Sequence, residues 1–214
     1  SRYYEDARQL AHLLTEWSMS LEESRHRFVV CSGGGPGIME AANRGAYEAG
    51  GKSVGLNIRL PFEQGANPVI AGDDKYVAMR YFFTRKLMLV KESRAFVCLP
   101  GGFGTLDEAM ETLTLVQTGK RNPLPLVLVD EPGGTYWTKW IAFLQDELRR
   151  RHYIGDSDFS FFRRVDSIEA AVGEINRFYS RYHSMRYVNG RLVIRLTSSL
   201  DSSHIKKLME RFAD

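Results

Sequence analysis

One nine-residue stretch combines residue types suited to holding an anion and cleaving a bond beside it: Pro100-Gly101-Gly102-Phe103-Gly104-Thr105-Leu106-Asp107-Glu108. Its glycines let the backbone bend sharply and approach a ligand closely. Thr105 is predicted as the N-cap of the following helix, whose free N–H groups and dipole favour a phosphate. Glu108 then falls in the first helical turn, beside the bound group. The alternative is a tight strand-to-helix connection in which Glu108 only complements the helix dipole.

A second glycine-rich turn follows an earlier apolar run, at Ser32-Gly33-Gly34-Gly35-Pro36-Gly37-Ile38-Met39-Glu40. It again has the order strand, turn, helix. We predict that Gly33, Gly34 and Gly35 form the floor of a nucleotide pocket. A tight helix entry without a ligand is the alternative.

Together these stretches resemble the LOG (Lonely Guy) family, cytokinin-activating phosphoribohydrolases long mislabelled as lysine decarboxylases. The Arg85-Lys86 pair stands fifteen residues before Pro100, as in that family. The resemblance covers about residues 4–179, and the segment 60–64 and the tail look more like the longer bacterial branch. It implies that the N-glycosidic bond of an adenine- or cytokinin-type nucleoside 5′-monophosphate is hydrolysed to free base and ribose 5-phosphate. It also implies a homodimer or larger homo-oligomer.

Carried onto this sequence, the resemblance makes Arg85 and Glu108 the catalytic pair. Glu108 would stabilise an oxocarbenium-like transition state, hold a sugar hydroxyl or activate water. Arg85 would orient Glu108 and keep it ionised, contact the phosphate or assist departure of the base. For both Arg85 and Lys86, a structural or surface role is the alternative. The expected substrate-binding residues are Gly33, Gly34, Gly35, Lys86, Pro100, Gly101, Gly102, Gly104, Thr105 and Asp107, with no metal and no cofactor.

Such residues need a parallel sheet to bring them together. Apolar runs predict strands at 28–31, 53–57, 95–99 and 126–129, with shorter candidates at 75–79 and 161–165. Helices are predicted at 4–17, 38–49, 81–93, 108–116, 136–150 and from a capping pair, Asp166 with Glu169, to about 182. The alternation predicts an α/β fold: a Rossmann-like, doubly wound parallel sheet flanked by helices.

Two domains are expected, a nucleotide-binding domain at 1–182 and a small appendage at 183–214. The appendage is predicted as a hairpin around Asn189-Gly190 and an amphipathic helix over 203–212. In the long loop over 59–74, Gln64 and Asn67 could read a base edge, or the loop could be simple surface. A further apolar strand with a Gly/Ser turn is expected upstream of Ser1, completing the sheet.

Composition and charge limit the classes of partner that this chain is expected to bind. A net charge of +3 is too mild to indicate a nucleic-acid partner, and no apolar run is long enough for a membrane span. Cys31 and Cys98 are predicted as buried thiols without metal-ligand spacing, which fits a reduced, cytoplasmic compartment. Trp137, Trp140 and the run Tyr81-Phe82-Phe83 are expected to supply aromatic surface for self-association.

Three alternatives to the hydrolase remain. A non-catalytic nucleotide or molybdenum-cofactor carrier could use the same fold, since fold does not fix function. The presence of both Arg85 and Glu108 favours the enzyme. Lysine decarboxylation normally needs pyridoxal phosphate on a Schiff-base lysine, and no pattern places one. A DNA-binding relative is poorly supported by the mild charge.

Overall fold

The computed structural model describes residues 2–21, 28–59 and 65–212 of the 214-residue chain. It divides into two compact units, Ser1–Glu174 and Ile175–Asp214. Each unit is described below by itself. None of the helices within the described ranges is both long and apolar enough to cross a membrane.

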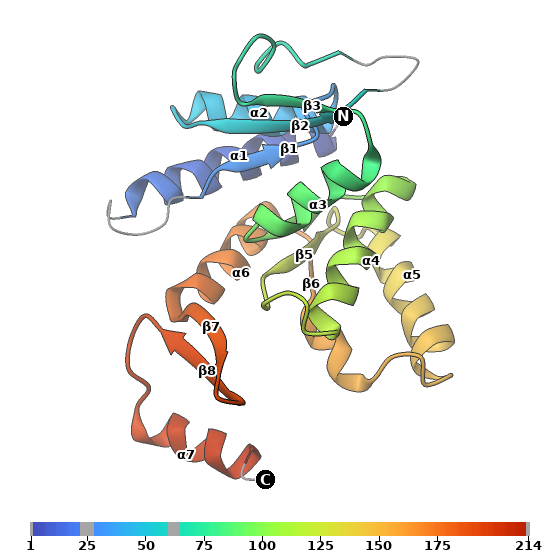
Figure 1. The fold of residues 1–214 in the computed structure, drawn as a ribbon. Helices are drawn as coiled ribbons and strands as arrows, with labels where there is room; N and C mark the ends of the chain where they lie inside the picture. The colour runs from blue at the N-terminus through green and yellow to red at the C-terminus, as the bar shows by residue number, and fades with distance from the viewer. Residues whose placement is uncertain (1, 22–27, 60–64, 213–214) are drawn as a thin grey trace. The chain divides into compact units, whose positions relative to one another are not determined.

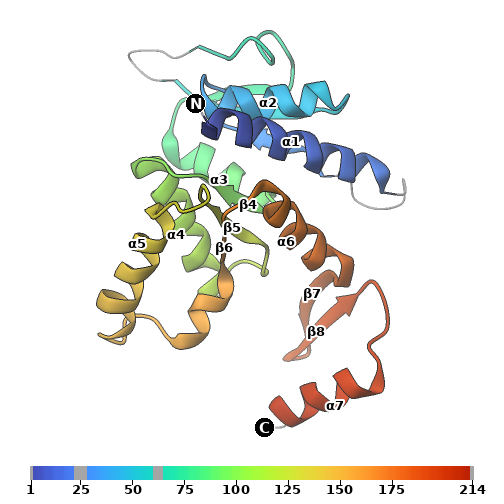
Figure 2. The ribbon, with the colours of Figure 1, turned by 180° about the vertical axis from the view of Figure 1, so that it is seen from behind.

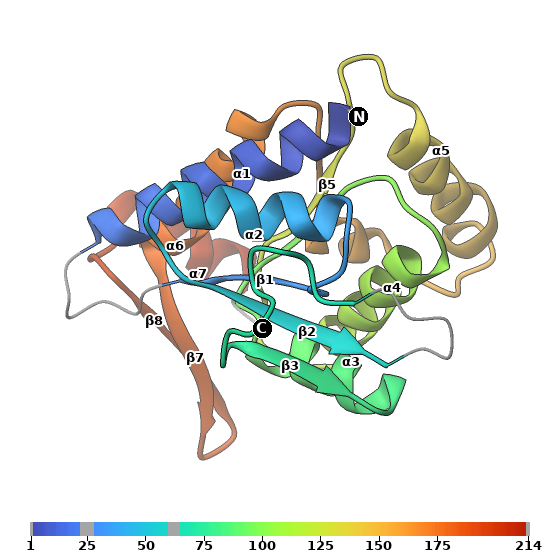
Figure 3. The same ribbon diagram turned by 90° about the horizontal axis from the view of Figure 1, so that it is seen from above.

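The first part of the larger unit is a parallel sheet with helices against it (Figure 1). Its strands are β1 (Val30–Ser32), β2 (Ser53–Ile58) and β3 (Tyr76–Met79), in the order β1-β2-β3. Helix α2 (Ile38–Glu48) packs on β1 and β2, and α1 (Arg2–Ser20) packs on α2. The two helices run side by side in Figure 3. The predicted helices and strands of this part are thereby confirmed, with bounds shifted by a few residues.

Small side chains line the closest contact of α1 with α2. The buried residues of α1 are Ala7, Leu10, Ala11, Thr15 and Ser18. A Cβ on Gly45 of α2 would lie 2.0 Å from the backbone oxygen of Arg8, so only glycine allows this approach. The bulkier side chains of α1, Leu13, Leu14 and Trp17, are half-buried.

A second parallel sheet forms the rest of the larger unit (Figure 2). It contains β4 (Phe96–Cys98), β5 (Leu126–Val129) and β6 (Arg163–Val165), in the order β4-β5-β6. The other elements are α3 (Phe82–Glu92), α4 (Phe103–Gln117), α5 (Tyr136–Phe143) with a π-helical continuation at Leu144–Arg149, a 3₁₀ helix at Asp156–Phe161, and α6 (Ile168–Arg181), which continues into the smaller unit. Parallel sheets flanked by helices confirm the predicted α/β class.

The two sheets are not joined by a ladder. Among the described residues, β1 pairs only with β2, and β4 pairs only with β5. The strand expected upstream of Ser1 stays a prediction. The domain boundary predicted at residue 182 also stays a prediction, because the sequence pattern locates the hairpin that follows it and not the boundary itself.

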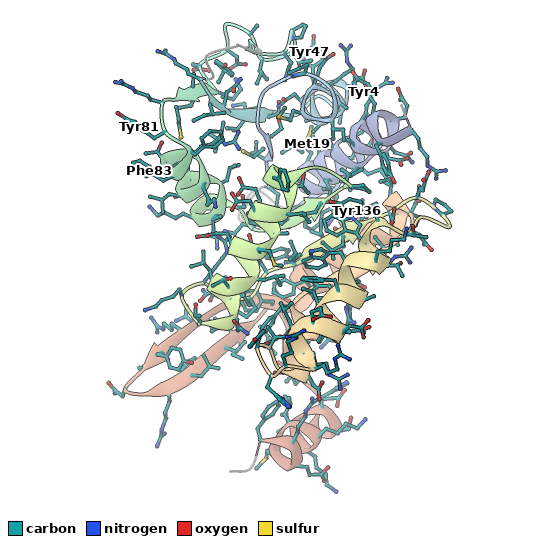
Figure 4. The ribbon with its side chains drawn as sticks, turned by 90° about the vertical axis from the view of Figure 1, so that its right-hand side faces the viewer. Tyr4, Met19, Tyr47, Tyr81, Phe83 and Tyr136 are labelled. Carbon is teal, nitrogen blue, oxygen red and sulfur yellow. The ribbon has the colours of Figure 1, made fainter. Side chains whose placement is uncertain are left out.

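The core of the second sheet corrects one prediction. Trp137 is fully buried among side chains of β4, β5 and α4, and its indole N–H donates to the Val129 carbonyl at 3.1 Å. Trp140 packs against the same core, with its ring edge-on to Trp137. Trp137 therefore offers no surface for self-association. By contrast, Tyr81, Phe82 and Phe83 are 51%, 59% and 69% exposed, and Figure 4 shows Tyr81 and Phe83 near α3.

The two cysteines also differ from each other. Cys98 is buried in the core beneath α4, and burial, with a smaller contribution from Glu108, raises its thiol pKa to about 12. The side chain of Cys31 is exposed. The prediction of a buried thiol is confirmed for Cys98, whereas Cys31 keeps exposed surface although desolvation by neighbouring atoms raises the pKa of its thiol to about 11.

The smaller unit is a hairpin followed by a helix. Strands β7 (Tyr182–Val188) and β8 (Arg191–Leu196) pair antiparallel, with Asn189 and Gly190 at φ 49° and 77° as a type I′ turn requires. Helix α7 (Ser202–Arg211) begins after Asp201, whose carboxylate accepts the His204 N–H at 2.9 Å. The predicted hairpin and helix are confirmed. The apolar stripe of α7 is exposed: Ile205, Leu208, Met209 and Phe212.

Candidate active site

The glycine-rich turn after β4 opens α4 earlier than predicted. The N-cap is Gly102, which is extended and carries no side-chain cap bond, and its carbonyl accepts the Leu106 N–H at 3.3 Å. Thr105 is therefore the third helical residue, and Glu108 lies in the second turn. A glycine can cap through its backbone alone, so the hydroxyl residue was not needed there. Among the described residues, no side chain accepts from the first N–H groups of α4, which is the arrangement that binds anions.

Two side chains outside the turn fix its shape. A Cβ on Gly101 would lie 2.2 Å from Thr105 Oγ1, so the threonine side chain folds back against the turn. The Tyr136 hydroxyl, from the first residue of α5, donates to the Gly101 carbonyl at 2.6 Å. Figure 4 labels Tyr136. Sequence reasoning missed this tyrosine, because nothing in the spacing connects the start of α5 to a turn thirty-five residues earlier.

The predicted catalytic pair is brought together from two helices. Arg85 of α3 and Glu108 of α4 form an ion pair with Nη2 and Oε1 3.8 Å apart, and both side chains are 18% exposed. Arg85 Nε and Glu108 Oε2 are buried and have no hydrogen-bond partner among the described residues. An ideal Cβ on Gly33 would lie 3.9 Å from Arg85 Nη1. The structure thus places the Gly33–Gly37 turn beside Arg85, which pairs with Glu108.

Lys86 and Asp107 engage each other. Lys86 Nζ donates to Asp107 Oδ1 at 2.7 Å and lies 3.9 Å from Glu111 Oε2. The hydrogen bond to Asp107 raises the pKa of the Lys86 ammonium, so the group stays protonated. The pair links α3 to α4 at the surface, with the Asp107 side chain 56% exposed. Its contribution to stability is small, since exposed ion pairs contribute about 0–1 kcal/mol.

The net pKa shift of Glu108 differs from the expectation. Burial raises the pKa of the Glu108 carboxyl most, and the nearby Asp107 and Glu111 raise it further. Arg85 lowers this pKa as predicted, and so does Lys86, but the net shift is upward because desolvation penalises the charged form most. A carboxyl with a raised pKa is suited to proton transfer.

This shift predicts an acid limb in the pH profile of any reaction that needs ionised Glu108. Activity should rise with pH through the raised pKa, because the carboxylate forms only above it. We expect the kcat/KM limb to lie above the ordinary glutamate range. Glu111→Gln removes a charge that raises the Glu108 pKa, so the limb should move to lower pH without loss of turnover.

The measurement is base release against pH for both proteins. A limb that stays at the same pH in Glu111→Gln would be due to the substrate phosphate and would contradict this assignment.

The second glycine turn lies between β1 and α2 and is held from below by buried polar groups. Gly34 has φ 70° and packs against Gly55, whose Cα would lie 3.2 Å from a Cβ on Gly34. Asn67 is 2% exposed and its amide donates to Gly35 O and Asn43 Oδ1. It is therefore not free to read a base edge, and that prediction is wrong. Gln64 lies outside the described residues. Sequence reasoning missed Asn43, because a polar residue inside a predicted helix is ordinarily taken as exposed.

The N-terminal cap of α6 also differs from the predicted pair of Asp166 and Glu169. The hydroxyl of Ser167, not Asp166, accepts a helix N–H, that of Ala170 at 3.2 Å. The predicted partner Glu169 instead accepts a hydrogen bond from Gln9 at 3.1 Å. Within the described ranges, no three histidine, cysteine or acidic side chains are grouped so that they could hold a metal ion.

Comparison with known proteins decides the family. A family profile described as possible lysine decarboxylase matches residues 39–175. A cytokinin riboside 5′-monophosphate phosphoribohydrolase of Arabidopsis thaliana is 30% identical over 162 residues, covering 76% of this chain and 73% of the relative. The chain belongs to the LOG family. The resemblance predicted from the two glycine turns and the Arg-Lys pair is confirmed.

Other relatives agree at the level of the family and the fold. A probable phosphoribohydrolase of the same kind from Arabidopsis thaliana is 34% identical over 103 residues, which span 48% of this chain and 50% of that LOG protein. The matches thus cover from half to about three quarters of these two relatives. The Moco carrier protein from Chlamydomonas reinhardtii superposes with a TM-score of 0.53 over 82% of this chain and 86% of its own, at 18% identity. That likeness concerns the fold alone.

Proposed function

We propose that this LOG protein hydrolyses the N-glycosidic bond of a nucleoside 5′-monophosphate of adenine or cytokinin type. The bond from the anomeric carbon to the base nitrogen breaks, and water supplies the hydroxyl to the sugar and the proton to the base. The products are free base and ribose 5-phosphate. The observation that carries the proposal is the half-buried Arg85–Glu108 pair beside an uncapped helix N-terminus.

The turn before α4 supplies the phosphate site in this proposal. Gly102 leaves the first N–H groups of the helix without a side-chain acceptor, and the positive end of the helix dipole adds to them. Gly101 and Gly104 present backbone without side chains, and Thr105 adds a hydroxyl. Lys86, already bonded to Asp107, contributes positive charge at the rim more than a direct contact.

Glu108 acts on the sugar in this proposal. A carboxylate near the anomeric carbon stabilises the positive charge of an oxocarbenium-like transition state or takes a proton from water. Its Oε2 is buried without a hydrogen-bond partner in the described part of the chain, so it can accept a sugar hydroxyl or a water. Arg85 Nε likewise has no partner there and can donate to the substrate while Nη2 holds Glu108 in place.

Two other functions are less well supported. A Schiff-base lysine needs a lowered pKa, whereas Asp107 raises that of Lys86, so the site does not fit pyridoxal phosphate bound through this residue. A nucleotide or molybdenum-cofactor carrier would need no catalytic carboxylate. The carrier proposal would gain support if nucleotides bound without being cleaved.

The test is to incubate the purified protein with the 5′-monophosphates of the common nucleosides and of an N6-isopentenyl adenosine, and to measure released base by chromatography. Base release from the adenine-type monophosphates supports the proposal. Tight binding of those nucleotides with no base released, at protein concentrations equal to substrate, contradicts it.

We further propose that copies of the chain associate through the exposed aromatic face of α3. Tyr81, Phe82 and Phe83 are three consecutive aromatic residues, each more than half exposed, and exposed apolar patches mark interaction sites. Light scattering at micromolar concentration should give at least the mass of a dimer, and Phe83→Ser should lower it. Phe143→Ser, which changes a 51% exposed residue on α5, is the matched control and should not. A monomer mass for the unaltered protein contradicts this.

A further inference from the structure

Two buried asparagines beneath the Gly33–Gly37 turn, Asn43 and Asn67, take no direct part in the proposed reaction. We propose that Asn67, assisted by Asn43, is a positioning residue that fixes the Gly33–Gly37 turn against Arg85. The inference rests on the proposed function for its chemistry, and on the hydrogen bonds of this network for its geometry.

Asn67 binds two consecutive carbonyl groups of the turn. Its backbone N–H donates to Gly34 O at 2.9 Å, and its side-chain amide donates to Gly35 O at 3.1 Å. All peptide bonds in the described chain are trans, so the Gly35 N–H points opposite to the Gly34 carbonyl. Drawing that carbonyl toward Asn67 therefore turns the Gly35 N–H to the other side of the turn, as a donor.

Asn43 closes the network. Its Oδ1 accepts both the Asn67 amide at 2.9 Å and the Ser32 hydroxyl at 2.7 Å, while the Ser32 oxygen accepts the Gly34 N–H at 3.0 Å. Asn43 is fully buried and Asn67 nearly so. Buried polar networks with their partners satisfied specify one conformation, because any other leaves a buried donor or acceptor unpaired. The end of β1, α2 and the loop after β2 are thus tied to one shape of the turn.

The loop that carries Asn67 is itself locked beneath the turn. Asn67 Oδ1 accepts the Val69 N–H at 3.1 Å, and the Asn67 carbonyl accepts the Ile70 N–H at 3.2 Å. Ile70 is 2% exposed, and its Cδ1 lies where side chains on Gly34 and Gly55 would have to go. The loop after β2 therefore packs beneath the Gly33–Gly37 turn and supports it.

The Gly33–Gly37 turn lies next to Arg85 of the catalytic pair. The Cβ position of Gly33 lies 3.9 Å from Arg85 Nη1, and Arg85 Nη2 lies 3.8 Å from Glu108 Oε1. The turn lies beside the guanidinium, so a change in its shape changes the space available to Arg85. Small displacements of positioning groups reduce catalysis strongly, by up to about 100-fold for 1 Å. Asn67 thereby influences the reaction without touching the substrate.

The experiment compares Asn67→Ala with Thr15→Val, which removes a buried hydrogen bond in α1 far from the turn. The readouts are KM and kcat for adenosine 5′-monophosphate, with thermal unfolding measured in parallel. We expect Asn67→Ala to raise KM at least ~10-fold, because the turn loses its fixed geometry. Thr15→Val should lower the unfolding temperature and leave KM unchanged. A fall in kcat that only matches the fraction of unfolded Asn67→Ala protein at the assay temperature, with KM unchanged, would mean a purely structural role and would overturn the proposal.

Ser32→Ala is the milder variant should Asn67→Ala not fold. It removes the acceptor of the Gly34 N–H and should raise KM by about threefold to tenfold, and an unchanged KM would overturn the proposal. Hydrogen–deuterium exchange of residues 32–40 gives a readout without catalysis: exchange should be faster in Asn67→Ala and unaltered in Thr15→Val. Absence of base release by the unaltered protein counts against the proposed function, whereas unaltered exchange in Asn67→Ala counts against this proposal.

Discussion

We expect Glu108→Gln to lower kcat for base release from adenosine 5′-monophosphate by at least ~100-fold, with only a modest rise in the dissociation constant of the nucleotide. The amide keeps the shape and one acceptor of the side chain but removes its negative charge. That charge interacts most strongly with the oxocarbenium-like transition state, and less with the neutral sugar of the bound substrate. The loss should therefore appear in kcat. The measurement is single-turnover base release beside direct titration of nucleotide binding.

Glu111→Gln is the matched control for this variant. Glu111 lies one turn further along α4, its side chain is 42% exposed, and it is 3.9 Å from Lys86. Removing its charge should change turnover by no more than about twofold to threefold. Equal losses in both variants would mean that the charge of α4 as a whole, and not Glu108, matters. Near-normal turnover in Glu108→Gln would remove Glu108 from the mechanism.

The thermal stability of Glu108→Gln distinguishes a loss of catalysis from a loss of folded protein. Because the Glu108 pKa is raised in the folded protein, the fold binds that proton more tightly than the unfolded chain does. Glu108 therefore lowers stability as the pH rises through its folded pKa, and the cost is absent at acid pH. The unfolding temperature of Glu108→Gln at neutral pH should be no lower than that of the unaltered protein.

The second large effect concerns the substrate phosphate. We expect kcat/KM for adenosine to be at least ~1000-fold below that for adenosine 5′-monophosphate. Charge-assisted hydrogen bonds contribute about 1.5–3 kcal/mol each, so two or three from the uncapped end of α4 amount to this factor. The measurement is initial-rate base release from both compounds. Comparable rates for adenosine and its 5′-monophosphate would contradict the phosphate site.

Two controls locate that phosphate site. Adenosine 3′-monophosphate carries the same charge at the wrong position and should be no better than adenosine. Thr105→Val removes a hydroxyl but leaves the backbone N–H groups of α4, so it should reduce kcat/KM by about tenfold, far less than loss of the phosphate. A rate with the 3′-monophosphate close to that with the 5′-monophosphate would indicate nonspecific charge attraction.

Several features of this chain follow from the sequence alone because they depend on neighbouring residues. Asn189-Gly190 determines a type I′ hairpin, since both positions need positive φ and few residues accept it. The continuous apolar run at Leu126–Val129 determines a buried parallel strand. The spacing of Arg85, the glycines and Glu108 sufficed to identify the family and to place the pair at one site.

Tertiary structure decided what depends on residues distant in the chain. Trp137 looked like surface and is core, because α5 packs against β5. Asn67 was considered as a contact to the base edge, but it is buried and supports the glycine turn, because α2 brings Asn43 beneath the loop. The pKa of Glu108 rises where its arginine neighbour predicted a fall, because the cost of desolvation depends on how much of the folded protein surrounds the carboxyl, and spacing in the sequence does not contain that quantity.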